Sequence, residues 1–169
     1  QVFEEIPLRD IVSWTLLITG YAQLGETNQV FSLFDRIRED TTHDPNLITF
    51  VGVLNACSHG GLLDKGPYYF DIMSNEYGLV PTLEHHTCMI DLFARAGHFD
   101  KALTLINGMP ISDYIEVWTT LLGACRKSEN MELGRWVFEK SVQLDENCGR
   151  TYVFMENIYA AAEMQTDAG

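Results

Sequence analysis

The chain has 169 residues, of which 24 are acidic and only 11 are lysine or arginine, so its net charge is −13. This excess of acid argues against a protein that holds nucleic-acid phosphates through a broad basic surface. No apolar run approaches the roughly 18 residues that a membrane-spanning helix needs, which excludes that class as well.

The sequence repeats itself. Five stretches align when their starts are set at Ile11, Leu47, Leu83, Ile115 and Gly149, with spacings of 36, 36, 32 and 34 residues. The fourth residue of every stretch carries a ring: Trp14, Phe50, His86, Trp118 and Tyr152. A period of this length predicts a repeat array, in which no repeat can bury its apolar face alone. We therefore expect function along a stacked surface and not in one pocket.

The first repeat, residues 11–46, is predicted to form two helices. Trp14 and Ile18 are spaced to lie on one face of an amphipathic helix, and Gly25 supplies the left-handed backbone that commonly ends a helix. A second helix then carries Phe34 on its apolar face. The later repeats follow the same scheme, so the predicted fold is all-α, a right-handed α-solenoid of helix-turn-helix repeats.

The predicted boundaries follow from this alignment. Residues 1–10 end a preceding repeat, and the repeats that follow span 11–46, 47–82, 83–114, 115–148 and, incompletely, 149–169. A chain that begins without methionine and shows no signal or transit peptide is expected to be a piece of a longer protein.

Metal and catalytic sites are not expected. Cys57 and Cys125 both occupy the eleventh position of a repeat, which indicates small buried apolar residues, and no C-x-x-C motif exists. The run from His85 to Cys88 resembles a ligand set, but adjacent residues on a helix point to different faces. Because phosphate-binding loops, nucleophile motifs and zinc-deaminase motifs are also missing, we predict a binding module that uses no cofactor.

Several motifs carry a family resemblance that runs from end to end. They are Val2–Pro7 with Arg9–Thr15, Thr49-Phe50 with Val53–Leu62, Glu84–Leu92 with Arg95–Gly97 and Met109-Pro110, Trp118 with Leu121–Arg126, and Tyr152 with Asn157–Ala160. In this order they resemble the last P-type, L-type and S-type repeats of a plant pentatricopeptide repeat protein of the PLS class, followed by an E1 motif at 115–148 and a partial E2 motif at 149–169.

The resemblance implies that the first helices line a surface that binds single-stranded RNA, with one base per repeat. The fifth and the last residue of a repeat approach one base together, which are Thr15 and Asn46 in the first repeat. By the family's pairing, threonine with asparagine favours adenine, while Val12 and Ile48 sandwich the faces of the base. The alternatives are that Thr15 is a solvated helix residue and that Asn46 only caps a helix.

The next two repeats depart from the family's pattern. Their pairs are Val51 with Thr82, an apolar group with one hydroxyl, and Thr87 with Tyr114, where a tyrosine takes the place at which the family usually has aspartate. Their base preference stays open.

Residues 115–169 are expected to bind protein. The resemblance implies that the extension motifs dock a cytidine deaminase domain or editing helper proteins, with Trp118, Tyr152, Phe154, Ile158 and Tyr159 as the contact residues. The implied function is a specificity factor for C-to-U RNA editing in a mitochondrion or chloroplast. The negative charge favours the alternative, a protein-interaction scaffold without RNA readout.

Overall fold

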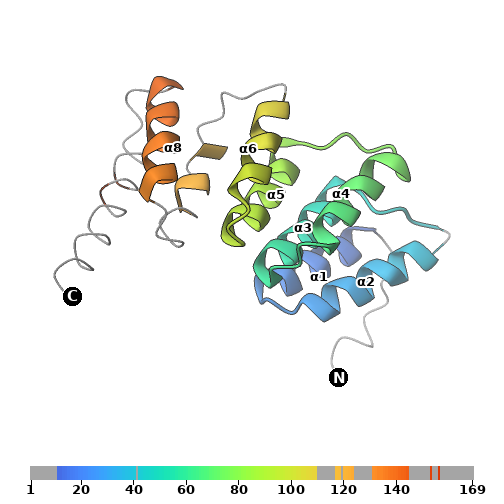
Figure 1. Ribbon diagram of the computed structural model, residues 1–169. Helices are drawn as coiled ribbons and strands as arrows, with labels where there is room; N and C mark the ends of the chain where they lie inside the picture. Colours follow the sequence, from blue (N-terminus) through green and yellow to red (C-terminus); the bar gives the residue numbers. More distant parts are fainter. Residues whose placement is uncertain are drawn as a thin grey trace. The chain divides into compact units, whose positions relative to one another are not determined.

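The computed structural model describes residues 11–40, 42–109, 117–118, 120–123, 131–144, 153 and 156. The chain divides into an N-terminal part, residues 1–89, and a C-terminal part, residues 90–169. The helices are α1 (Ile11–Gln23), α2 (Thr27–Glu39), α3 (Leu47–Gly60), α4 (Lys65–Asn75), α5 (Leu83–Arg95), α6 (Phe99–Gly108) and α8 (Met131–Leu144) (Figure 1). Residues 117–118 and 120–123 are also helical, and no described residue belongs to a strand. The predicted all-α fold is confirmed.

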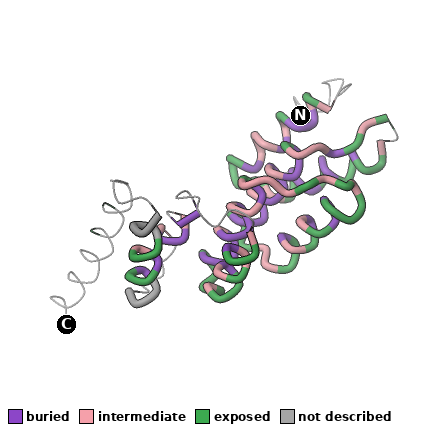
Figure 2. The backbone as a smooth tube through the Cα atoms, turned by 90° about the horizontal axis from the view of Figure 1, so that it is seen from above, coloured by how far each residue is buried: buried purple, intermediate pink, exposed green. Residues whose placement is uncertain are grey.

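The N-terminal part contains two helical hairpins. Helix α1 packs against its hairpin partner α2 and against α3, the first helix of the next hairpin, and α3 packs in turn against α4. The buried residues lie where these helices face one another (Figure 2). The helices α1, α3 and α5 begin at the residues that open the first three repeats.

Each first helix ends in the way that its sequence predicts. Gly61, the residue after α3, has a φ of 63° and lies in the left-handed region, and its N–H is bonded to the carbonyl oxygens of Cys57 and Ser58. Gly25 and Gly97 follow α1 and α5 with positive φ values of 75° and 78°. A side chain would strain the backbone at these positions, which explains why glycine recurs there.

Aromatic rings in the core join helices within a hairpin and between neighbouring hairpins. The ring of Phe50 on α3, which is fully buried, meets the rings of Phe34 on α2 and Tyr77 after α4 edge to face, with centroids 5.3 and 5.5 Å apart. In the C-terminal part, Trp118 meets Trp136 on α8 at 6.0 Å. The ring at the fourth position therefore packs against its own hairpin and, at Phe50, also against the preceding one, and such pairs contribute about 0.5–1.5 kcal/mol beyond their buried area.

The two first helices of the N-terminal part approach each other closely at Gly52. A Cβ atom built on Gly52 would lie 2.7 Å from Cγ2 of Ile18 and 3.3 Å from Cγ2 of Thr19. Because Ile18 is fully buried and branched at its Cβ atom, it cannot easily move aside. Glycine is therefore the residue that lets α3 lie against α1.

The cysteines within the described residues are buried, and neither forms a disulfide. They are Cys57 on α3 and Cys88 on α5, and burial raises the pKa of the Cys57 thiol to about 12. This agrees with the predicted packing role of Cys57, whereas Cys125 lies outside the described residues. The described part of the chain holds no cluster of three or more potential metal ligands, and none of its helices is long and apolar enough to cross a membrane.

Candidate nucleic-acid interface

The candidate surface is built on α1 and α3, whose sequences contain no aspartate, glutamate, lysine or arginine. Val12 on α1 and Ile48 on α3 occupy the second position of successive repeats, and each is 60% exposed. Exposed branched apolar side chains at matching positions of two packed helices can cover the two faces of a flat ring. The geometry therefore suits a stacked base better than a phosphate.

Asn46, the last residue of the first repeat, is held by the start of α3. Its side-chain oxygen Oδ1 accepts hydrogen bonds from the backbone N–H of Thr49 at 2.9 Å and from the Thr49 hydroxyl at 3.1 Å. The Thr49 hydroxyl oxygen in turn accepts from the backbone N–H of Asn46 at 3.2 Å, which completes a capping box. The backbone donor fixes which amide atom is the oxygen, so the Asn46 NH₂ group points away from the cap.

Thr15 joins the same network from α1. Its hydroxyl lies 3.0 Å from the hydroxyl of Thr49, and the residue is only 6% exposed. Thr15 is thus not the solvated helix residue of the alternative interpretation. Since the single hydroxyl hydrogen of Thr49 is donated to Asn46, Thr15 must donate its own hydrogen to Thr49. The structure brings Thr15 and Asn46 together, and it does so through Thr49.

The second repeat ends on a different network. The Thr82 hydroxyl donates to a carboxylate oxygen of Glu84 at 3.0 Å and lies 2.8 Å from Nδ1 of His85, which also accepts the Thr82 backbone N–H at 3.1 Å. Nε2 of His85 donates to the carbonyl oxygen of Leu47 at 3.0 Å. Val51, the predicted partner of Thr82, is half-buried on α3.

His85 is the buried centre of this second network. The residue is fully buried, and burial lowers the pKa of its ring, although the carbonyl of Leu47 and the carboxylate of Glu84 act to raise it. Because Nδ1 must be an acceptor for the Thr82 N–H, the ring is neutral with its proton on Nε2, which donates to Leu47. The residue that resembled a metal ligand in the sequence is a structural histidine.

The third predicted pair is only partly described. Thr87 is half-buried on α5, and its hydroxyl donates to the carbonyl oxygen of Leu83 at 2.9 Å, one turn earlier in the same helix. Its hydrogen is therefore already used within the helix. Tyr114 lies outside the described residues.

Among the residues predicted to bind protein, only Trp118 is described. Trp118 is 5% exposed, and its ring packs against the partly exposed ring of Trp136. It therefore contributes to the core of its hairpin and exposes little surface of its own. The other four, Tyr152, Phe154, Ile158 and Tyr159, lie outside the described residues.

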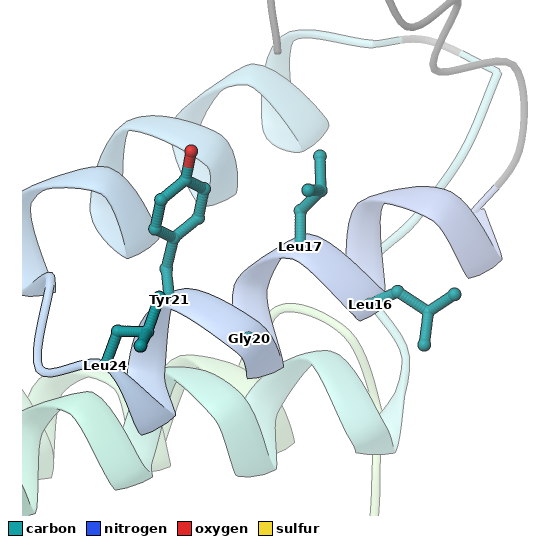
Figure 3. Close-up of a pocket in the computed structure, with 5 residues that line it drawn as sticks. All are labelled: Leu16, Leu17, Gly20, Tyr21 and Leu24. Carbon is teal, nitrogen blue, oxygen red and sulfur yellow. The ribbon is translucent and has the colours of Figure 1, made fainter. Parts of the chain in front are cut away.

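An open apolar pocket of about 190 Å³ lies on α1. Leu16, Gly20 and Leu24 follow one another along the helix, with Leu17 and Tyr21 beside them (Figure 3). Leu16 occupies the sixth position of the first repeat. In the second and third repeats, the residue at this position contacts the first helix of the preceding repeat. Gly52 meets Ile18, and the thiol of Cys88 lies 3.8 Å from Oδ1 of Asn55. This pocket is smaller than common ligand sites, and its place in the repeat indicates a packing surface.

Sequence reasoning missed two residues of the interface, Thr49 and His85. Both occupy the third position of a repeat, two residues before the predicted reading position and three after the last residue of the preceding repeat. The sequence signal that could have identified them is the capping-box spacing, a cap residue followed three positions later by its partner, as in Asn46 to Thr49 and Thr82 to His85.

The family follows from comparison with known sequences. The PPR repeat model matches residues 12–41, 84–113 and 116–145, which together make up more than half of the chain. The chain belongs to the pentatricopeptide repeat family. Its relatives in Arabidopsis thaliana include the mitochondrial pentatricopeptide repeat-containing protein At2g03880, 44% identical over 96% of this chain, and the chloroplastic protein At3g49170, 40% identical over 96%. The chain spans only 26% and 19% of these two proteins.

Solved structures show the same fold. The pentatricopeptide repeat protein PPR10 in complex with an 18-nt psaJ RNA element matches 95% of this chain with a TM-score of 0.81 at 20% identity, over 24% of its own length. PPR10 from maize in another crystal structure matches 94% with a TM-score of 0.62 at 14% identity, over 22% of its length. The predicted solenoid of helical repeats is thereby confirmed.

Proposed function

We propose that this chain is a sequence-specific reader of single-stranded RNA and that Asn46 reads one base. The observation that carries the proposal is the Asn46 amide, whose oxygen is bonded twice to Thr49 while no described residue accepts from its NH₂ group. Val12 and Ile48, which are expected to sandwich the faces of this base, are both exposed. The structurally similar PPR10 is in complex with an 18-nt RNA element, and repeats of this kind read one base each with two or three side chains at regular spacing.

Adenine suits the first repeat. Its N1 atom accepts from the Asn46 amide, and its N6 amino group donates to the oxygen of Thr15. Guanine presents N1–H towards the amide donor, which leaves two donors opposed. Cytosine has the same order of donor and acceptor as adenine, but its smaller ring overlaps less with Val12 and Ile48.

We further propose the finer role that the resemblance implied, a PLS-class specificity factor for C-to-U editing in a mitochondrion or chloroplast. In this role residues 115–169 dock a cytidine deaminase domain or helper proteins, and this chain itself performs no catalysis. The names of the mitochondrial and chloroplastic relatives support an organellar location. The competing function is a protein scaffold, which the net charge of −13 favours.

The experiment tests the apolar sandwich in the intact protein. Val12→Asp and Ile48→Asp should together weaken binding to an RNA selected from a random single-stranded library by at least about tenfold, because burial of a valine or isoleucine side chain against the base is worth about 1.5–3 kcal/mol. Val80→Asp is the matched control, since Val80 is 79% exposed but lies outside the first helices. Equal RNA binding by the wild type, the double variant and the Val80→Asp control would favour the protein-scaffold function.

The same variants test the editing role in plants that lack the protein. Sequencing of organellar transcripts should reveal one or a few cytidines that are no longer edited. The wild-type protein and the Val80→Asp variant should restore editing, and the Val12→Asp, Ile48→Asp variant should not. Normal editing in the plants that lack the protein would contradict this role.

A further inference from the structure

We infer that the third residue of a repeat sets the hydrogen-bond polarity of the side chains that meet the base edge. Thr49 does so for Thr15 and Asn46, and His85 does so for Thr82. This inference rests on the proposed function. It adds two residues, Thr49 and His85, that influence which base is preferred without touching the base. They are positioning residues, because each acts through the direction of a hydrogen atom on a neighbour.

At Thr49 the direction of each hydrogen is fixed by counting donors. The Asn46 oxygen receives the backbone N–H and the hydroxyl hydrogen of Thr49, so the Asn46 amide faces outward as a donor. The Thr49 oxygen, having given up its only hydrogen, must accept the hydrogen of Thr15 at 3.0 Å. Thr15 is left with lone pairs only, and the pair offers one acceptor beside one donor.

This order matches one class of base edge. Adenine and cytosine carry an amino donor next to a ring-nitrogen acceptor, which is the complement of Thr15 and Asn46. Guanine and uracil carry a carbonyl acceptor next to a ring N–H, which is the reverse order. Without the Thr49 hydroxyl, the Thr15 hydrogen would be free to donate to the guanine O6 atom, and the selectivity from this side would be lost.

At the next junction Glu84 and His85 together impose a different polarity. The Thr82 hydroxyl has both the Glu84 carboxylate and the His85 Nδ1 atom within reach, at 3.0 and 2.8 Å, and both are acceptors. The Thr82 hydrogen is therefore held within the protein, and only lone pairs remain for a base. Since Val51 has no polar atom in its side chain, this repeat favours a base edge with a ring N–H, as in guanine and uracil.

The test compares Thr49→Val, which keeps the shape and removes the hydroxyl, with Thr49→Ser, which keeps the hydroxyl. Each intact protein selects from a random single-stranded RNA library, and Asn46→Asp identifies which RNA position this repeat reads. At that position Thr49→Val should lower the ratio of adenine to guanine by about threefold to tenfold, the value of one hydrogen bond. Thr49→Ser should keep the wild-type ratio, and the neighbouring positions should not change.

Several outcomes separate this inference from the proposed function. If Asn46→Asp changes no position, the repeat reads no base and the proposed function fails. If Asn46→Asp changes one position but Thr49→Val leaves its adenine-to-guanine ratio intact, only the present inference is wrong. Should Thr49→Val fail to fold, Thr49→Ala also removes the hydroxyl without touching the base-contacting residues and should cause the same loss of selectivity.

The second junction has its own test in the same selection. Thr82→Val should remove the preference for guanine or uracil at the adjacent RNA position, because the acceptor is deleted while the shape is kept. An unchanged preference there would overturn the acceptor role assigned to Thr82.

Discussion

At the residue scale, Thr49 and His85 occupy equivalent positions in successive repeats and form equivalent hydrogen bonds with different side chains. Thr49 and His85 each satisfy the residue that precedes their helix and each bond to the helix of the preceding repeat. The histidine does this with one acceptor nitrogen and one donor nitrogen, so it can serve only while it is neutral. Its protonation state is therefore linked to the stability of the α5 start.

His85 should make folding stability depend on pH. Burial lowers its pKa in the folded state, so below its ordinary value of 6.5 the unfolded chain binds a proton that the folded chain does not. Stability from this group is present above pH 6.5 and is lost as the pH falls towards the folded-state pKa, by at most about 1.4 kcal/mol per pH unit.

The variant to compare is His85→Gln, which is neutral at every pH and retains a donor and an acceptor. Urea unfolding of both proteins between pH 8 and pH 5 should show a smaller loss of stability in the variant. Parallel curves would mean that His85 is not held neutral by its surroundings.

At the element scale, the packing of α3 on α1 depends on a glycine that the periodicity of the sequence did not mark. Gly52 lies within the apolar run of α3, where helix propensity alone would favour alanine. The repeated apolar positions predicted the helices and their order. They could not predict the distance between α1 and α3, because that depends on which small residue meets which branched one.

Replacing Gly52 with alanine should therefore destabilise the chain by about 1–3 kcal/mol, the typical cost of overpacking, although alanine is the better helix former. Gly20→Ala is the matched control on α1, since no atom lies within 4 Å of its added Cβ. The control should stabilise the chain by about 0.5–1 kcal/mol. Urea unfolding of both variants measures the difference, and a stabilising Gly52→Ala would contradict the close approach of the two helices.

The candidate site shows the same division between what the sequence predicts and what it does not. Repeat phase placed Val12 and Ile48 at equivalent positions, and both are exposed. Phase also paired Thr15 with Asn46, but the burial of Thr15 and the mediating role of Thr49 depend on contacts between helices. Such contacts join residues 34 positions apart and leave no local pattern in one sequence.

At the scale of the whole molecule, charge and reading surface are separated. The chain carries a net charge of −13, yet α1 and α3 contain no aspartate, glutamate, lysine or arginine. A base can therefore approach these two helices without meeting a fixed negative charge on them. Because an uncharged surface holds phosphates weakly, affinity must be built up over many repeats, one base at a time.

The account rests on the claim that Asn46 reads a base, and one substitution tests it directly. Asn46→Asp replaces the outward NH₂ donor with a carboxylate oxygen, which accepts from the N1–H and N2–H groups of guanine. This charge-assisted bond outweighs the neutral contact of Thr15. Binding of the intact protein to RNAs that carry each of the four bases at the aligned position should show the preference shift from adenine to guanine. An unchanged preference would contradict base reading by this repeat and make the protein scaffold the leading function.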